Sequence, residues 1–268
     1  MIETFHLYIT ATQVHARRQS GWRQQIHPLA EWEWDAASPA SLSFKKIPCK
    51  KILRPNLHVH LGSALCKFMT VDLPAGLHNV QEQSAAGQAQ MQYQLGLSAS
   101  DWVFTLNRPR SPAEFVSSLV CAVRRPVIER LQELSKDSGL RLVSLKPYIA
   151  GVWNAVQAGP RHLAQLESAL LAIEHDAFTL FVGRAGTLES MNTLSHVAEP
   201  DLIEREIKRL GYSLGRAVQD TVRLVLAEGC LTMAQAHADK ILVKSDYLKK
   251  PLYADFRDLL FHADEEHP

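Results

Sequence analysis

Several common signatures of enzyme chemistry are missing from this 268-residue sequence. It contains no GxxxxGK[ST] phosphate loop, no GxGxxG turn and no GxSxG nucleophile elbow, so it does not indicate a P-loop enzyme or a serine hydrolase of the α/β type. The four cysteines form no CxxC pair, which argues against a zinc ribbon or a thioredoxin-type site. The apolar settings of Cys66, Cys121 and Cys230 are typical of reduced core residues in a cytosolic protein.

An excess of charge and long apolar runs are also absent. Lys and Arg together number 29 and Asp and Glu 28, a net charge of +1, which argues against binding of a nucleic acid backbone. No apolar run approaches the roughly 18–20 residues of a membrane span, and the first residues lack the basic start of a signal peptide. We therefore expect contact with a membrane only through a partner.

Hydrophobic periodicity predicts a mixed α/β order in the first part of the chain. A hairpin is expected from residue 5 to about residue 14, with the polar stretch 17–23 as its end, and the prolines make residues 28–55 an irregular insertion. Further strands are expected at 57–61, 65–71, 102–106, 116–123 and 140–145, and helices at 77–95, 126–139 and from 147.

The second part changes character. Three apolar runs at 166–173, 178–182 and 188–194, separated by short polar breaks, predict an antiparallel meander. A helix is expected from residue 200, followed by a strand at 222–226. The pattern predicts two halves, residues 1–160 and 161–268, divided near residues 157–163.

The second half resembles a known fold. Its meander from Leu170 to Leu194, its Glu- and Arg-rich helix start at 201–206 and the string Val222 to Gly229 resemble the second subdomain of the actin/Hsp70-type ATPases. In particular they resemble the PilM protein of type IV pilus assembly and the cytoplasmic part of GspL of type II secretion. Residues 119–126 and 139–148 are similar to the stretch that joins the two subdomains of that family. The resemblance implies an α/β protein of two RNase-H-like subdomains, with mixed sheets flanked by helices.

The sequence departs from this family where nucleotide is bound. ATP-binding members hold phosphates on Gly-bearing hairpin turns with an Asp nearby. Here the first hairpin offers residues 9–12 without Gly or Asp, the second offers residues 174–177 without Gly, and the adenine side offers one Gly, at 229. The resemblance places a vestigial nucleotide cleft at Thr10, Asp176, Thr179, Glu228 and Gly229. We interpret the chain as a non-hydrolysing member with no catalytic residue and no resident cofactor.

The resemblance also implies a function. We expect a non-catalytic, cytoplasmic scaffold in a bacterial pilus or secretion platform, at the inner membrane through its partner. The partner would be the cytoplasmic segment of a bitopic, PilN-like membrane protein, and the motor ATPase and a second copy of the chain are further candidates. The alternative is an ATP-binding enzyme of the same fold, an ATPase or a small-molecule kinase, with Asp176 organising the metal.

Three other patterns leave alternatives open. His58 and His60 share one face of a strand, where they are either two ligands of a metal or part of a solvated surface. Trp32 and Trp34 form either a docking strip for a partner or a loop packed down by two indoles. The lysines of residues 45–51 form either a contact for acidic groups or a solvated loop.

Overall fold

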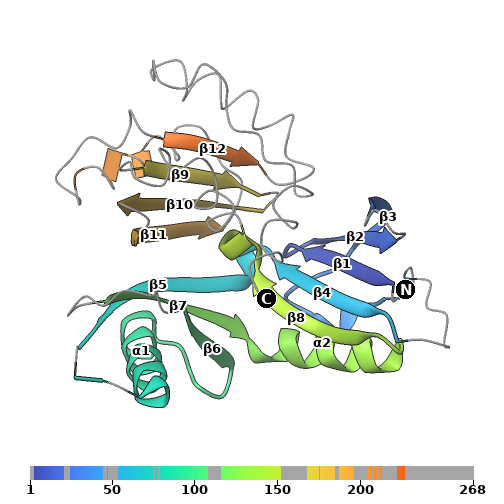
Figure 1. Ribbon diagram of the computed structural model, residues 1–268, viewed down its shortest axis with the longest axis horizontal. Helices are drawn as coiled ribbons and strands as arrows, with labels where there is room; N and C mark the ends of the chain where they lie inside the picture. The colour runs from blue at the N-terminus through green and yellow to red at the C-terminus, as the bar shows by residue number, and fades with distance from the viewer. Residues whose placement is uncertain are drawn as a thin grey trace.

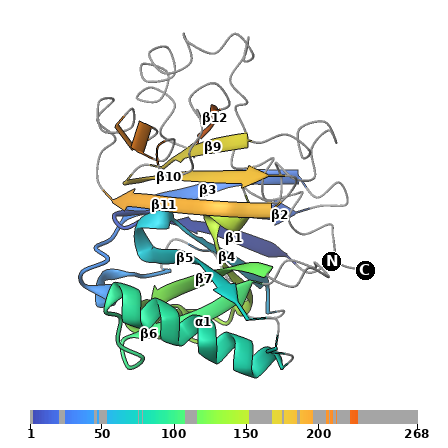
Figure 2. The ribbon, with the colours of Figure 1, turned by 90° about the vertical axis from the view of Figure 1, so that its left-hand side faces the viewer.

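The computed structural model describes residues 3–20, 25–44, 47, 54–74, 76–77, 79–107, 116–151, 168–174, 176–184, 187–195, 205–206, 208–209, 212 and 222–226. Three β-sheets organise these residues. They are sheet A, of strands β3-β2-β1-β4-β8, sheet B, of β5-β7-β6, and sheet C, of β11-β10-β9-β12. In the two views, sheet C lies over sheet B, with β11 next to β5, and sheet A lies beside both (Figure 1, Figure 2).

Sheet A begins as a meander and continues in parallel. β1 (Thr4–Ile9), β2 (Gln13–Ser20) and β3 (Gln25–Glu33) pair antiparallel in sequence, and β4 (Asn56–Leu61) then joins the other side of β1 in parallel. β8 (Arg141–Pro147) extends the parallel part beside β4. The predicted first hairpin and the strand at 57–61 are confirmed.

Sheet C repeats this topology. β9 (Ser168–Ile173), β10 (Ala177–Arg184) and β11 (Thr187–Ser195) form the predicted antiparallel meander, and β12 (Val222–Leu226) joins the free side of β9 in parallel. The first strand of each sheet thus lies between its hairpin partner and a later parallel strand. Two sheets with the same order of connections indicate a duplicated architecture in one chain.

Sheet B and its helix stand beside this pair of sheets. β5 (Cys66–Leu73), β6 (Trp102–Asn107) and β7 (Val116–Arg124) are antiparallel, and α1 (Val80–Leu95) packs on them. Asn79 caps the start of α1 by accepting a hydrogen bond from the Gln81 amide at 2.8 Å. Gly96, with φ of +64°, ends the helix as predicted.

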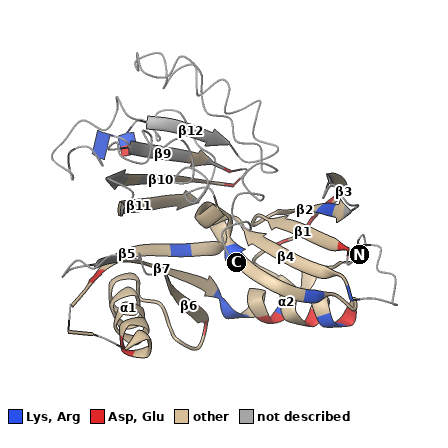
Figure 3. Cartoon of the chain, viewed as in Figure 1, with Lys and Arg blue, Asp and Glu red and all other residues tan. Residues whose placement is uncertain are grey.

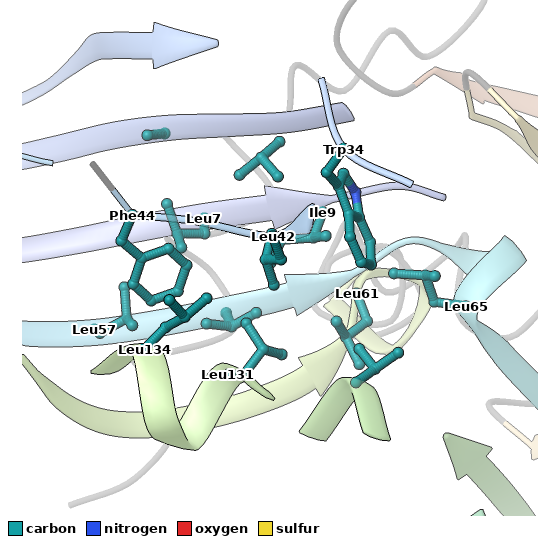
Figure 4. Packing of buried hydrophobic residues seen from close by; sticks show 14 of the residues in the cluster. Leu7, Ile9, Trp34, Leu42, Phe44, Leu57, Leu61, Leu65, Leu131 and Leu134 are labelled. Carbon is teal, nitrogen blue, oxygen red and sulfur yellow. The ribbon is translucent and has the colours of Figure 1, made fainter. Parts of the chain in front are cut away.

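The main core lies between sheet A and α2 (Arg125–Asp137). Leu7, Leu57, Leu131 and Leu134 are fully or almost fully buried there, and the short helix η1 (Pro39–Ser41) leads into Leu42, which closes the same cluster (Figure 4). The exposed positions of α2 include several charged residues, which are coloured along this helix in Figure 3. This separation of apolar and charged faces explains the strong helical periodicity that the sequence shows at 126–139.

Two expectations for the first hairpin region are wrong in part. Residues 17–20 continue β2 rather than ending the hairpin, because Arg17 is buried and pairs in register with His6 of β1. Residues 28–33 belong to β3, so the irregular segment does not begin at Pro28. Pro28 is tolerated since β3 is the edge strand and the register shifts beside it.

The remaining predicted elements are described in part. Residues 148–151 continue as a helix after β8, and residues 205–206, 208–209 and 212 lie in the expected second-half helix. The predicted boundary near residues 157–163 lies outside the described residues. None of the helices described is long and apolar enough to span a lipid bilayer.

Candidate functional site

The first hairpin turns of sheets A and C meet. In sheet A the Thr10 amide donates to the Gln13 carbonyl at 2.9 Å, and in sheet C the Glu174 amide donates to the Ala177 carbonyl at 2.8 Å, so the two turns close in the same way. The amide of Ala11 in the first turn donates directly to the carboxylate of Asp176 in the second. We call this region, formed by residues 8–13, 62–63, 174 and 176–177, the interlobe junction.

Glu174 connects sheet C to sheet A at the interlobe junction. Its carboxylate accepts hydrogen bonds from the Tyr8 hydroxyl at 2.7 Å and from the Ser63 amide at 3.1 and 3.0 Å. Only 4% of the residue is exposed. Tyr8 lies on β1, Ser63 begins the short helix η2 (Ser63–Leu65) after β4, and Glu174 directly follows β9. One side chain of sheet C is therefore held by two donors from the other part of the molecule.

Burial determines the electrostatics of this carboxyl. It raises the pKa of Glu174 to about 7, although the hydrogen bonds from Ser63 and Tyr8 act in the opposite direction, and the charge of Asp176 adds to the increase. Burial, followed by the charge of Glu174, also raises the pKa of the Tyr8 hydroxyl. Close to neutral pH, Glu174 is thus divided between its charged and neutral forms.

The predicted site residues do not all lie in one site of the structure. Thr10 is buried and stabilises its own turn, since its hydroxyl oxygen accepts from the Gln13 amide at 3.0 Å and its carbonyl accepts from the Trp34 indole at 2.8 Å. Thr179 is buried inside sheet C and shares a hydrogen bond with the Thr193 hydroxyl at 2.9 Å. Thr10 and Asp176 are brought together in the interlobe junction. Glu228 and Gly229 lie outside the described residues.

Sequence analysis overlooked three residues of the interlobe junction: Tyr8, Ser63 and Glu174. Glu174 belongs to the second hairpin of the sequence analysis, but the acidic residue expected to act there was Asp176. A signal existed in the sequence, because Glu174 directly follows the apolar run Leu170–Ile173. An acidic residue at the end of a buried strand is costly unless donors meet it, so it marks a position where donors converge.

Backbone N–H groups at the end of sheet A already donate hydrogen bonds to carboxyl groups of the same chain. Backbone N–H groups at hairpin turns and helix starts are the groups with which proteins bind phosphates. At the interlobe junction, the N–H groups of Ala11 and Ser63 point to the carboxylates of Asp176 and Glu174. Two negative side chains of the chain itself occupy donors of the kind that a phosphate ligand uses.

A cluster of histidines lies on the polar face of sheet A. His6, His58 and His60 face the same side, and the His6 ring stacks on His58 and His60 with centroids 5.2 and 6.5 Å apart. The shared face of His58 and His60 is as predicted. Within the described residues, no three His, Cys, Asp or Glu side chains are arranged to hold a metal ion.

The two tryptophans pack against the molecule. Trp34 is 6% exposed, and Trp32 is partly buried against the main core cluster. This favours packing of the two indoles over a docking strip, but Trp32 lies in strand β3 rather than in a loop. The lysines at 45, 46, 50 and 51 lie outside the described residues.

A duplicated sheet topology whose first hairpins face each other is the architecture of the actin-like ATPase fold, and the comparison with solved structures identifies that fold here. An actin-like ATPase-fold protein of unknown function from Bacteroides thetaiotaomicron is 12% identical, with a TM-score of 0.59 over 90% of this chain and 88% of that chain. The PilM-PilN type IV pilus biogenesis complex gives 15% identity and a TM-score of 0.64, covering 90% and 86%.

The same fold is found in a secretion protein. The cytoplasmic domain of EpsL, an inner membrane component of the type II secretion system of Vibrio cholerae, is 10% identical with a TM-score of 0.51, covering 84% of this chain and 81% of that chain. The fold expected from the resemblance to PilM and GspL is therefore confirmed. No protein-family model and no curated protein matches the sequence.

Proposed function

We propose that this chain is a non-catalytic scaffold of a type IV pilus or type II secretion-like assembly platform. It binds the cytoplasmic segment of a bitopic, PilN-like inner-membrane protein and works in the cytoplasm next to that membrane. The likeness in fold to PilM, solved in complex with PilN, and to the cytoplasmic domain of EpsL supports this class of function. A motor ATPase and a second copy of the chain are proposed as further partners.

The observation that carries the proposal is the filled interlobe junction. A triphosphate needs backbone donors and cations around it, and here the N–H groups of Ala11 and Ser63 face carboxylates. A nucleotide phosphate at this place would lie against two acidic side chains, Glu174 and Asp176, and would have to displace their hydrogen bonds. Electrostatic repulsion and the loss of these bonds both oppose nucleotide binding.

Calorimetric titration with ATP and Mg²⁺ tests the non-catalytic part. We expect no heat of binding for the unmodified chain at nucleotide concentrations up to the millimolar range. Micromolar binding that is abolished in Asp176→Ala would contradict the proposal and favour the alternative, an ATP-binding enzyme of this fold. Asp137→Ala serves as the control, because Asp137 is an exposed acidic residue at the end of α2, a helix that packs on β7, β8 and η1.

The partner is tested by direct binding. Synthetic peptides from the cytoplasmic N-terminal segments of one-span membrane proteins, encoded beside this chain's gene, are titrated into the purified protein. We expect saturable binding of one such peptide and none of its scrambled version. Absence of binding for every adjacent one-span protein would refute the proposed partner and leave the nucleotide result unaffected.

A further inference from the structure

The interlobe junction joins segments that are far apart in the sequence. Tyr8 and Glu174 are separated by 166 positions, and Ala11 and Asp176 by 165. These contacts run from Glu174 and Asp176 of the β9–β10 turn to β1, to the β1–β2 turn and to Ser63 after β4. Glu174 and Asp176 therefore bind to backbone N–H groups at the end of sheet A, in the way that an anionic ligand would.

We propose that this turn is a latch between sheets A and C, and that Glu174 takes up a proton when the latch closes. The latch would hold the two sheets in one relative orientation, which is a task that bound ligands perform in many two-lobed proteins. This inference concerns the chain itself and holds whichever partner the protein binds.

The proton uptake follows from the surroundings of the carboxyl. Closing the latch moves Glu174 from water into a site where only 4% of the residue is exposed. Removal from water disfavours the charged form, and so does the nearby carboxylate of Asp176. Two donors, the Ser63 amide and the Tyr8 hydroxyl, favour the charged form without balancing the effect of burial, since the pKa rises to about 7. In the closed form Glu174 keeps its proton up to about pH 7. In the open form it loses this proton above the ordinary pKa of a Glu side chain.

The other ionisable groups around Glu174 do not reverse this sign. Among the described residues they are Tyr8 on β1, Tyr148 after β8, Cys66 at the start of β5, Asp176 on the same turn, and His15 of β2, which stacks on Tyr8. Burial also raises the pKa of Tyr8, and the hydrogen bond with Cys121 and burial raise that of Cys66, so both stay neutral near pH 7. Asp176 is a second negative charge, which favours protonation of Glu174.

Linkage gives the direction of the pH effect. Since the closed form has the higher pKa, the closing equilibrium is strongest at low pH and weakens by up to tenfold per pH unit between about pH 5 and pH 7. Above pH 7 it becomes independent of pH, because Glu174 is then deprotonated in both forms. Glu174→Gln has no such proton, but its amide oxygen still accepts from Ser63 and Tyr8, so its closing equilibrium should not vary over this range.

Hydrogen exchange of the Ala11 and Ser63 amides in the full chain tests the latch, because each amide is protected by its bond to a carboxylate. Protection factors, corrected for intrinsic exchange, are measured from pH 5 to pH 8. We expect a decrease towards pH 7 in the unmodified protein and a flat profile in Glu174→Gln. Glu174→Ala should lower the protection of Ser63 by tenfold or more, and Glu133→Gln on the exposed side of α2 is the control.

Two results would overturn the proposal. One is a Glu174→Ala protein that folds and protects both amides as well as the unmodified protein does. The other is a pH profile of the unmodified protein that runs parallel to that of Glu174→Gln. The second comparison uses a near-isosteric variant, so it decides the question even where Glu174→Ala fails to fold.

Discussion

Burial favours the neutral form of Glu174 at the interlobe junction and of His60 on sheet A. His60 is 3% exposed, and its ring stacks with His6. Burial is the main cause of its lowered pKa, and His6 and His58 act in the same direction. A cation at this position would be both desolvated and repelled, so the fold requires the neutral imidazole.

We predict that buried, neutral His60 lowers the free energy of unfolding in mild acid. Its folded pKa is depressed, so its contribution to stability is complete above the ordinary histidine pKa of about 6.5 and is lost as the pH falls below it. The loss can reach about 1.4 kcal/mol per pH unit for one proton. In His60→Phe, which keeps an aromatic ring in the stack, this component should disappear from urea unfolding measured between pH 7 and pH 5.

The comparison of the two proteins isolates His60 from Glu174. Glu174 has the opposite sign, because its folded pKa is raised and its contribution increases as the pH falls below about 7. The unmodified protein reports the sum of both, whereas the difference between it and His60→Phe contains the histidine alone. Equal slopes in the two proteins would show that His60 is not held neutral.

Single residues also define what the sequence could reveal about the candidate site. Asp176 was predicted from its place in the turn, and the structure puts it at the interlobe junction. Tyr8 and Ser63 have no local feature that marks them, since their role comes from a partner more than 100 positions away. Such contacts arise from how two sheets pack, which no periodicity within a short window encodes.

Elements were predicted well where one local pattern decided them. The alternation at 57–61 and the spacing of apolar residues at 126–139 correctly predicted β4 and α2, because the apolar residues of each recur with the period of a strand or a helix. β3 was missed because Pro28 interrupts its pattern, and the register shift that accommodates the proline is set by β2. Proline excludes a central strand more reliably than it excludes an edge strand.

Helix α1 offers a test of packing at the scale of an element. A Cβ added at Gly87 would lie 3.0 Å from Cγ2 of Val120 and 3.2 Å from Cδ1 of Leu106, so the helix rests on sheet B with almost no space. We predict that Gly87→Val destabilises the protein by about 1–3 kcal/mol through overpacking, despite the poor helix propensity of glycine. Chemical denaturation followed by far-UV circular dichroism measures this loss.

Ala85→Val on the exposed side of α1 is the matched control, since it introduces the same side chain without a neighbouring strand. Its cost should stay at about 0.5 kcal/mol, which is the difference in helix propensity. Similar losses for the two variants would mean that α1 is not tightly packed at Gly87.

The whole molecule depends on how two similar sheets are joined. The resemblance to the actin-like family implied two similar subdomains, but the repeated order of strands was predicted only in part, because β3 was missed. The contact between the two sheets could not be predicted, since Tyr8, Ser63 and Glu174 belong to no motif. The space left for that contact is small, and Gly62 lies in it between the end of β4 and the turn of sheet C.

We predict that Gly62→Ala acts as a wedge at the interlobe junction. Its Cβ would lie 3.0 Å from Oε2 of Glu174, 3.2 Å from the Ile9 carbonyl oxygen and 3.2 Å from Cα of Thr10. The backbone at Gly62 is extended, with φ of −61° and ψ of 155°, so alanine is strained only by contacts and not by its own conformation. The expected cost is about 1–3 kcal/mol of closing free energy, seen as a lower protection of the Ser63 amide and a larger radius of gyration in small-angle scattering.

In Gly76→Ala nothing lies within 4 Å of the added Cβ, so both quantities should stay unchanged. Unchanged protection of the Ser63 amide in Gly62→Ala would mean that the two sheets can separate and reorient at no cost. The contacts of Glu174 would then not fix their arrangement.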